Sequence, residues 1–381
     1  MKKKLRSLLR IVFGRTAFML LFIILQLAFF FGIVHWISSE YSLISYAGLH
    51  LLGTLTCIYI YNKPENPSFK LSWIIPVLAF PVFGTLLYLY VELEISGRII
   101  SKRANRLVKE SRIYLQQDQK VLSHLEDEDD RLSGLANYVG EFGGFPVYEN
   151  YTAEYFPSGE QKFERLKEEL EKARKFIFME YFIVEHGVMW DTILEILERK
   201  AKEGVEVRFM YDGMCSIALL PYHYPKILEA KGIHCHAFAP IKPALSTYQN
   251  NRDHRKIVVI DGHTAFTGGV NLADEYINVK ERFGYWKDVA VMIKGEAVKN
   301  FTIMFLQMWN IWEKTPLDYE KYLSHDLPQQ IEGRRSEGFV LPYGDSPLDH
   351  EPVGKMVYLD ILNTAKKYVH IMTPYLILDD E

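Results

Sequence analysis

The sequence predicts N-terminal transmembrane helices, then an α/β domain with a mainly parallel sheet flanked by helices, then the truncated start of a second such domain. Three observations lead to this fold class. Long uncharged apolar runs occupy the first 91 residues. Strand-like and helix-like segments alternate after about residue 145. A short helix–strand pattern recurs near the end of the chain.

The composition fits a folded protein with a membrane segment. The 381 residues include 44 Lys and Arg against 48 Asp and Glu, which gives a net charge of −4. A nucleic-acid-binding protein would carry a basic excess, so we expect no nucleic-acid partner. Hydrophobic residues make up 49% of the chain, which excludes wholesale disorder. The three cysteines are too far apart to suggest a disulfide framework or a structural zinc site.

Residues 1–91 are predicted to form a membrane anchor with two to three apolar segments. Three runs contain no Lys, Arg, Asp or Glu: 16–37, 41–61 and 71–91. Each matches the roughly 20 residues that a helix needs to cross a bilayer. The first run also exceeds the roughly 15-residue core of a signal peptide. The third contains Pro76, Pro81 and Gly84, which leaves a kinked or re-entrant helix open.

Flanking charges orient this anchor. The first 15 residues carry six Lys and Arg and no acid, and basic residues cluster again between Arg98 and Arg112. By the positive-inside rule, both ends of the anchor lie in the cytoplasm. An even number of crossings is then required although three runs are present, so one run would be re-entrant or interfacial. We therefore expect a multi-pass protein of the cell membrane.

Residues 92–144 are predicted to form a charged helical linker, because apolar residues recur there at helical spacing. Residues 145–335 then alternate in the way that builds a parallel sheet between helices. The predicted helices are 160–175, 190–203 and 225–231, and the predicted strands are 176–184, 205–211, 233–239, 256–260 and 264–267.

Residues 336–381 are predicted to begin a second half that is cut short. A helix end running into a strand occurs at 170–177 and again at 362–369. A Met-Glu-Tyr-Phe stretch follows the first copy, and Met-Thr-Pro-Tyr follows the second at nearly the same distance. The alternative to a true repeat is chance similarity between two amphipathic junctions.

One segment combines residue types that suit phosphate chemistry. His254 and Lys256 lie two residues apart on a predicted extended segment, so they project from the same face. The apolar strand 257–260 follows and fixes both, and Asp261 closes that strand at a turn.

Two glycines and an amide complete this motif. Gly268 and Gly269 allow the backbone to approach a ligand closely, and Asn271 follows with an amide donor. Lysine and asparagine can hold the non-bridging oxygens of a phosphodiester, and an imidazole can attack phosphorus. A His-x-Lys pair alone has little specificity, whereas the full spacing His-x-Lys-x4-Asp-x6-Gly-Gly-x-Asn is far more specific.

The pattern resembles the HKD motif of the phospholipase D superfamily, and within it the chain is most similar to bacterial cardiolipin synthases. The closer resemblance covers nearly the whole chain. It is carried by 66–73 (NPSFKLSW), 268–276 (GGVNLADEY), 286–288 (WKD), Trp309 and 373–375 (TPY). Gly269 is a departure, because many superfamily members have serine there and its hydroxyl contact to phosphate is absent here.

The resemblance implies a role for each motif residue. His254 would be the nucleophile that forms a phosphatidyl-histidine intermediate, and Lys256 and Asn271 would bind the phosphate. Asp288 would orient or polarise His254. Asp261, the acid of the motif, would be mainly structural.

In the family, one phosphatidylglycerol donates its phosphatidyl group to a second, which gives cardiolipin and glycerol. The resemblance implies the same substrate here, with the catalytic part on the cytoplasmic face of the membrane. It implies neither metal nor cofactor, and no further ligand joins His234 and His236 on their strand face. The alternatives are a phospholipase D-like hydrolase that releases phosphatidic acid, a nuclease and a catalytically inactive membrane fragment.

Superfamily members carry two such motifs, and the second histidine acts as general acid and then as general base. Residues 1–381 contain no second His-x-Lys with the right sequel. Either the chain is a fragment of a longer protein or two copies pair as a homodimer, and the interrupted repeat favours the fragment. We therefore expect the 381-residue chain to lack synthase activity.

Overall fold

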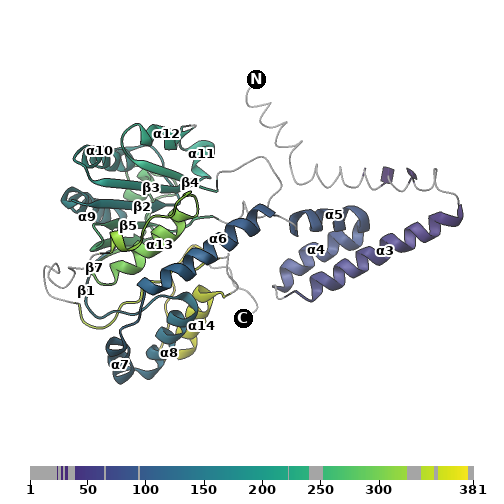
Figure 1. The fold of residues 1–381 in the computed structure, drawn as a ribbon, viewed down its shortest axis with the longest axis horizontal. Helices are drawn as coiled ribbons and strands as arrows, with labels where there is room; N and C mark the ends of the chain where they lie inside the picture. The colour runs from purple at the N-terminus through teal and green to yellow at the C-terminus, as the bar shows by residue number, and fades with distance from the viewer. Residues whose placement is uncertain are drawn as a thin grey trace. The chain divides into compact units, whose positions relative to one another are not determined.

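The computed structural model describes residues 39–63, 66–92, 95–221, 223–239, 252–323, 336–346 and 351–375, with isolated positions between 24 and 32. The first apolar run, 16–37, lies almost entirely outside these residues. The chain divides into two compact units, residues 1–95 with 245–247 and residues 96–244 with 248–381. Figure 1 shows three helices of the first unit and the sheet of the second.

The described part of the first unit is a group of three packed helices. They are α3 (Ser39–Tyr61), α4 (Pro67–Ala79) and α5 (Pro81–Glu92). Asn66 caps α4, because its side chain accepts a hydrogen bond from the backbone N–H of Ser68 at 2.9 Å. Gly84 lets α5 approach α4 closely, since a Cβ atom there would lie 2.5 Å from the carbonyl oxygen of Pro76.

Run 41–61 falls within the single helix α3, whereas run 71–91 is divided between the two helices α4 and α5. Its helix breaks at Phe80, because the residue before a proline disfavours helical backbone and Pro81 begins α5. The resulting α4 and α5 have 13 and 12 residues, or about 20 Å each at 1.5 Å per residue. Among the helices that the structure describes, none is both long enough and apolar enough to cross a membrane.

The region predicted as a helical linker contains several short helices. They are α6 (Ile95–Ser111), η1 (Arg112–Tyr114), α7 (Gln119–Glu128), α8 (Asp130–Tyr138) and the π-helix η2 (Val139–Gly143). α6 contacts the helix α13 (Val298–Asn310): Arg103 donates to the carbonyl of Asn310 at 3.0 Å, and Gln307 donates to the hydroxyl of Ser111 at 2.8 Å. This region is therefore packed against the second unit's own core.

A seven-stranded sheet in the order β1-β7-β6-β5-β2-β3-β4 forms the centre of the second unit. The strands are β1 (Tyr151–Phe156), β2 (Phe176–Tyr181), β3 (Glu206–Asp212), β4 (His234–Phe238), β5 (Ile257–Ile260), β6 (Thr264–Gly268) and β7 (Ala290–Gly295). The prediction of a mainly parallel sheet is wrong. Only the pairs β2–β3 and β3–β4 are parallel, and the other four are antiparallel. The tight turn between β5 and β6 forces antiparallel pairing.

Helices cover both faces of this sheet (Figure 1). On one face lie α9 (Gly159–Lys172) and α10 (Val188–Lys202), and on the other lies α13. Alternating residues of β5 divide between these faces, with Val258 and Ile260 toward α9 and α10 and with Ile257 and Val259 toward α13. The remaining short elements are α11 (Cys215–Ala218), α12 (Tyr224–Glu229), η4 (Asp274–Ile277) and η5 (Glu320–Tyr322).

The predicted second half begins with a helix, α14 (Val353–Thr364). Arg131 of α8 donates to the carbonyl of Thr364 at 2.9 Å and ties α14 to the first part of the same unit. The strand predicted after this helix is not formed in residues 365–375, which are largely exposed. In the first copy, β2 pairs with β3 and β5 on its two sides, and residues 365–375 have no such neighbouring strands within the described chain.

Candidate functional site

The predicted nucleophile and phosphate-binding cation approach β5 from the same side. Residues 252–256 run extended into the strand, and Lys256 follows the alternation that turns Val258 toward α9 and α10. Arg255 points the other way, to Glu180 on the α13 face. Arg255, the residue between His254 and Lys256, therefore lies on the opposite face of the strand from Lys256.

His254 is exposed between two aromatic rings. Its ring centroid lies 4.7 Å from that of Phe182 and 5.8 Å from that of Tyr375. Loss of water around the ring lowers the pKa of His254 below its ordinary value, and the neighbouring ammonium of Lys256 lowers it further. The lowered pKa favours the neutral form of the imidazole, which is the form that can act as a nucleophile.

Lys256 is buried beneath this histidine. Its ammonium donates to the carbonyl oxygen of His254 at 2.5 Å and lies 5.4 Å from the ring centroid of Phe182. Burial lowers the pKa of Lys256 to about 8, and the charges of Asp253 and Asp288 counteract part of that shift. A cation is therefore retained at neutral pH next to the imidazole.

Asn271 joins the same site through the residue after Phe182. Its side-chain oxygen accepts a hydrogen bond from the N–H of Ile183 at 2.9 Å, and its side-chain nitrogen donates to the hydroxyl of Tyr276 at 2.8 Å. Because Phe182 contacts both His254 and Lys256, the segment Phe182–Ile183 brings the three predicted residues together.

The two glycines permit close packing of β6 against the segment that leads into β7. A Cβ atom on Gly268 would lie 2.4 Å from the carbonyl oxygen of Val289, and its φ of +148° also disfavours other residues. A Cβ atom on Gly269 would lie 1.9 Å from a carboxylate oxygen of Asp288. Gly269 therefore leaves the space that this carboxylate occupies.

Asp288 and Asp261 are placed differently from each other. Asp288 lies at the site, where its charge acts on Lys256 and on Lys162, but it makes no hydrogen bond to His254 among the described residues. Asp261 lies at the far end of β5 from His254. The structure therefore brings Asp288 toward the lysines and keeps Asp261 out of the site.

Asp261 instead joins two strands. Its carboxylate accepts hydrogen bonds from the backbone N–H groups of Arg174, Lys175 and Phe176 at 2.7–2.8 Å. These groups begin β2, and the φ of +52° at Asp261 makes the turn that ends β5. The predicted structural role accounts for all of these contacts.

A buried polar network behind His254 is missing from the predicted site. Glu180 of β2 is fully buried, and its carboxylate lies 2.7 Å from the guanidinium of Arg255. Burial raises the pKa of Glu180 well above its ordinary value. The N–H of Asp253 donates to the buried carboxylate of Asp212 at 3.0 Å. Glu180 is the lone acid in the apolar stretch FIFMEYFIV, which was the available signal.

Lys162 is a second residue that the prediction missed. It is 2% exposed, and its ammonium donates to the hydroxyl of Tyr181 at 2.8 Å. Burial lowers the pKa of Lys162 to about 7, with the charge of Asp288 opposing the shift. It lies four and eight residues before Leu166 and Leu170, which puts it on the buried face of α9. This helical periodicity could have identified Lys162 as a buried lysine from the sequence.

The two histidines considered as metal ligands have other contacts. His234 pairs with Glu229 at 3.3 Å, and His236 pairs with Glu313 at 3.2 Å and packs against Trp309. No cluster of three metal-ligating side chains occurs among the residues that the structure describes.

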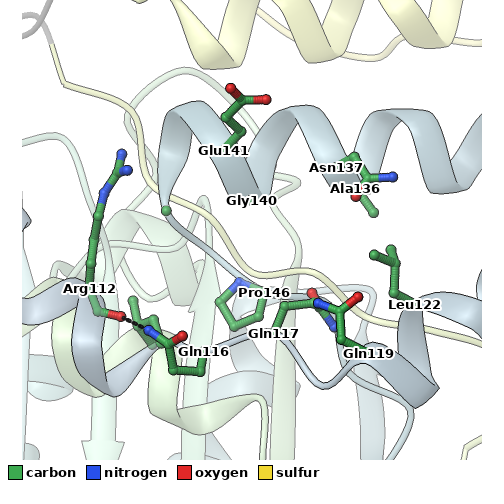
Figure 2. A pocket seen from close by; sticks show the side chains of 12 residues that line it. Arg112, Gln116, Gln117, Gln119, Leu122, Ala136, Asn137, Gly140, Glu141 and Pro146 are labelled. Carbon is green, nitrogen blue, oxygen red and sulfur yellow. Dashed lines mark hydrogen bonds between the residues drawn. The ribbon is translucent and has the colours of Figure 1, made fainter.

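A pocket of about 480 Å³ lies elsewhere in the second unit (Figure 2). Polar side chains from η1, α7, α8 and η2 line it, among them Arg112, Gln119, Asn137 and Glu141. None of the predicted site residues contributes to its wall. The candidate site on the sheet is therefore separate from this pocket.

Known proteins resemble this chain over most of its length. Residues 166–309 match the family described as "Cardiolipin synthase, PLD-like domain", and residues 51–91 match "Phospholipase_D-nuclease N-terminal". An uncharacterized protein of Streptococcus mutans is 50% identical over 85% of this chain and 69% of its own length. A cardiolipin synthase of Alkalihalophilus pseudofirmus is 31% identical over 87% of this chain and 66% of its own length.

A solved structure, the phosphatidylserine synthase of Haemophilus influenzae, is 14% identical over 55% of this chain and 51% of that chain, with a TM-score of 0.36. The chain spans 69% of the length of the Streptococcus mutans relative and 66% of the length of the Alkalihalophilus pseudofirmus cardiolipin synthase.

Proposed function

The chain belongs to the cardiolipin synthase-like family of the phospholipase D superfamily, and from this premise we propose that it carries one half of a phosphatidyltransferase site. The single observation that best supports this proposal is the shared contact of Phe182–Ile183 with His254, Lys256 and Asn271. A neutral imidazole, a buried ammonium and a fixed amide at one point suit attack on a phosphodiester.

The proposed reaction exchanges two alcohols at one phosphorus. A nitrogen of His254 forms a bond to the phosphorus of phosphatidylglycerol, and the bond to the glycerol oxygen breaks. That oxygen takes a proton as glycerol leaves. The hydroxyl of a second phosphatidylglycerol then gives up a proton and attacks the phosphorus, which releases His254 and yields cardiolipin.

The first step needs a group that gives a proton to glycerol, and the second step needs a group that takes a proton from the attacking hydroxyl. In the proposal both groups are the same residue, the histidine of a second His-x-Lys motif, which residues 1–381 do not contain. A second half of the same protein or a second copy of this chain can supply such a residue. Lys256 and Asn271 meanwhile hold the charge on the non-bridging oxygens.

A substrate with a good leaving group tests the nucleophile without the second motif. Phosphatidyl-p-nitrophenol needs no general acid, because nitrophenolate leaves unprotonated. We expect one burst of nitrophenolate per chain and a phosphatidyl adduct on His254 by mass spectrometry. His254→Ala should abolish both. His186→Ala, which removes an exposed imidazole paired with Asp191, is the matched control and should keep both.

Lipid products then separate transfer from hydrolysis. The complete protein, expressed in cells that lack cardiolipin, should produce cardiolipin from phosphatidylglycerol. Accumulation of phosphatidic acid instead would identify a hydrolase that uses water as acceptor. Unchanged lipids with the intact site, together with no adduct on His254, would contradict both enzymatic proposals and support an inactive membrane protein.

We also propose that the first unit associates with the cell membrane. Its described helices expose many large apolar side chains, among them Leu51, Leu55, Ile58, Phe69 and Ile75. Such a surface is unfavourable in water and suits a bilayer. Flotation of the chain with lipid vesicles tests this, and a chain that stays in the soluble fraction would contradict it.

A further inference from the structure

Residues 279–289 form an exposed aromatic loop next to the candidate site. Phe283 is 78% exposed, Tyr285 69% and Val279 58%, although all three are large and apolar or aromatic. Large side chains so exposed and so close together mark an interaction surface more often than chance placement does.

The base of this loop is rigid. The side chain of Asn278 closes it, because it donates to the carbonyl of Trp286 at 3.1 Å and accepts from the N–H of Trp286 at 2.6 Å. The ring of Trp286 packs 5.1 Å from that of Tyr276, whose hydroxyl accepts from Asn271. The exposed rings are therefore held out from a base that is joined directly to the site.

The loop carries a small excess of basic residues. It contains Lys280, Arg282 and Lys287 against two acids, Glu281 and Asp288. The ammonium of Lys280 and the guanidinium of Arg282 contact Glu185 and Glu275, and both basic side chains are still about half exposed, at 52% and 51%. Basic residues next to protruding aromatic rings suit the headgroup region of a bilayer, where aromatic rings sit at the level of the headgroups.

We propose that residues 279–289 are a membrane-docking loop that places Phe283 and Tyr285 in the interface of a bilayer containing anionic phospholipid. Docking brings lipid headgroups close to Asn271, because Trp286 of the loop packs against Tyr276, which is hydrogen-bonded to Asn271. The delivery of substrate rests on the proposed function, whereas the insertion of the loop does not. The bilayer is favoured over a protein partner because half-exposed basic side chains flank the protruding aromatic rings.

Site-specific quenching tests the insertion. Phe283→Cys and the control Tyr155→Cys, on β1 and 61% exposed, are each made in the chain with Cys57→Ser. The remaining cysteines, Cys215 and Cys235, are buried and should not react. Each variant is labelled with a fluorophore and reconstituted in bilayers of phosphatidylglycerol and phosphatidylcholine.

A label at position 283 should lose most of its emission to a nitroxide carried on lipid chains and be shielded from aqueous iodide. The label at position 155 should show the reverse. Equal iodide quenching at both positions would overturn the proposal. Shielding of position 283 from both quenchers would also overturn it, because the loop would then be covered by protein.

The nitrophenyl substrate separates this proposal from the proposed function. The double variant Phe283→Ser, Tyr285→Ser should lose more of its burst on bilayer-embedded substrate than on a monomeric short-chain substrate, whereas Tyr155→Ser should lose neither. An equal loss on both substrates would contradict substrate delivery. Absence of any burst in the unaltered chain would refute the proposed function and leave the quenching result to decide the insertion.

Discussion

Burial distinguishes the two side chains of the His-x-Lys pair. His254 is exposed and Lys256 is 6% exposed, although both lie on one side of the same strand. The histidine can therefore meet a phosphorus atom that arrives from solvent or from a lipid surface. The lysine remains beneath it as a cation whose attraction for phosphate is strengthened by the exclusion of water.

The pKa of Lys256 predicts how phosphate binding depends on pH. Because burial lowers this pKa to about 8, the ammonium is lost as the pH rises from 7 to 9. Binding of short-chain phosphatidylglycerol should weaken over this range by roughly tenfold, in proportion to the charged fraction. Lys256→Arg should remove most of the pH dependence. Titration calorimetry at several pH values measures it, and an equally steep decline in Lys256→Arg would contradict the assignment.

The contacts of Asp261 predict a loss of stability when its carboxylate is removed. Asp261→Ala leaves three backbone N–H groups at the start of β2 without their acceptor and puts alanine at a positive φ. The free energy of unfolding should fall by about 2–4 kcal/mol. Urea denaturation measures this change, with the exposed Asp127→Ala as control. A change no larger than that of the control would contradict the structural role.

At the scale of elements, local patterns identified many strands and helices but not their pairing. The predicted strands at 205–211 and 233–239 correspond to β3 and β4, because apolar strands between helices have a clear local signature. β1 and β7 were not predicted. They lie more than 130 residues apart in the chain and pair only with each other and β6. Their position depends on long-range contacts, which periodicity does not encode.

The close approach of β6 to the start of β7 predicts a strong effect at Gly268. In Gly268→Ala the new Cβ meets backbone atoms of Val289 and Ala290, which cannot move aside without breaking the pairing. We expect a loss of about 2–4 kcal/mol in the free energy of unfolding. Gly134→Ala is the matched control, because nothing lies within 4 Å of its Cβ and alanine favours a helix. Chemical denaturation compares the two, and equal stabilities would refute the packing argument.

At the scale of the whole molecule, segments distant in sequence complete the second unit. Residues 336–346 return to its start, where Tyr148 and Val340 form a bridge and Ser336 donates its N–H to the carbonyl of Tyr151. The motif itself was recognisable from spacing, because His254 and Lys256 are local partners. The network of Glu180 and Arg255 required the fold, since β2 and β5 are joined only by tertiary structure.

Lys162 predicts how the stability of the whole unit depends on pH. Its pKa is lowered to about 7 in the folded protein and returns to its ordinary value of about 10.5 on unfolding. Between these values the unfolded chain binds more protons, so this group makes stability rise with pH from 7 toward 10.5. Lys162→Met should remove this contribution and leave that of Lys256.

Thermal unfolding between pH 7 and 9 measures the difference. The melting temperature of Lys162→Met relative to the unaltered chain should be highest at pH 7 and fall as the pH rises. An offset that does not change with pH would show that the pKa of Lys162 in the folded protein is close to its ordinary value, and would contradict the prediction. Lys167→Met, which removes a less buried lysine of the same helix, is the control.

The hydrogen bond from the ammonium of Lys256 to the carbonyl of His254 has a mechanical consequence. In the proposed reaction, the ammonium that binds the phosphate is hydrogen-bonded to the backbone of the residue that attacks the phosphorus. A displacement of the backbone at this point should therefore move both groups together. The relative position of His254 and Lys256 then does not depend on a rigid surface loop, because both side chains are attached to the same backbone segment.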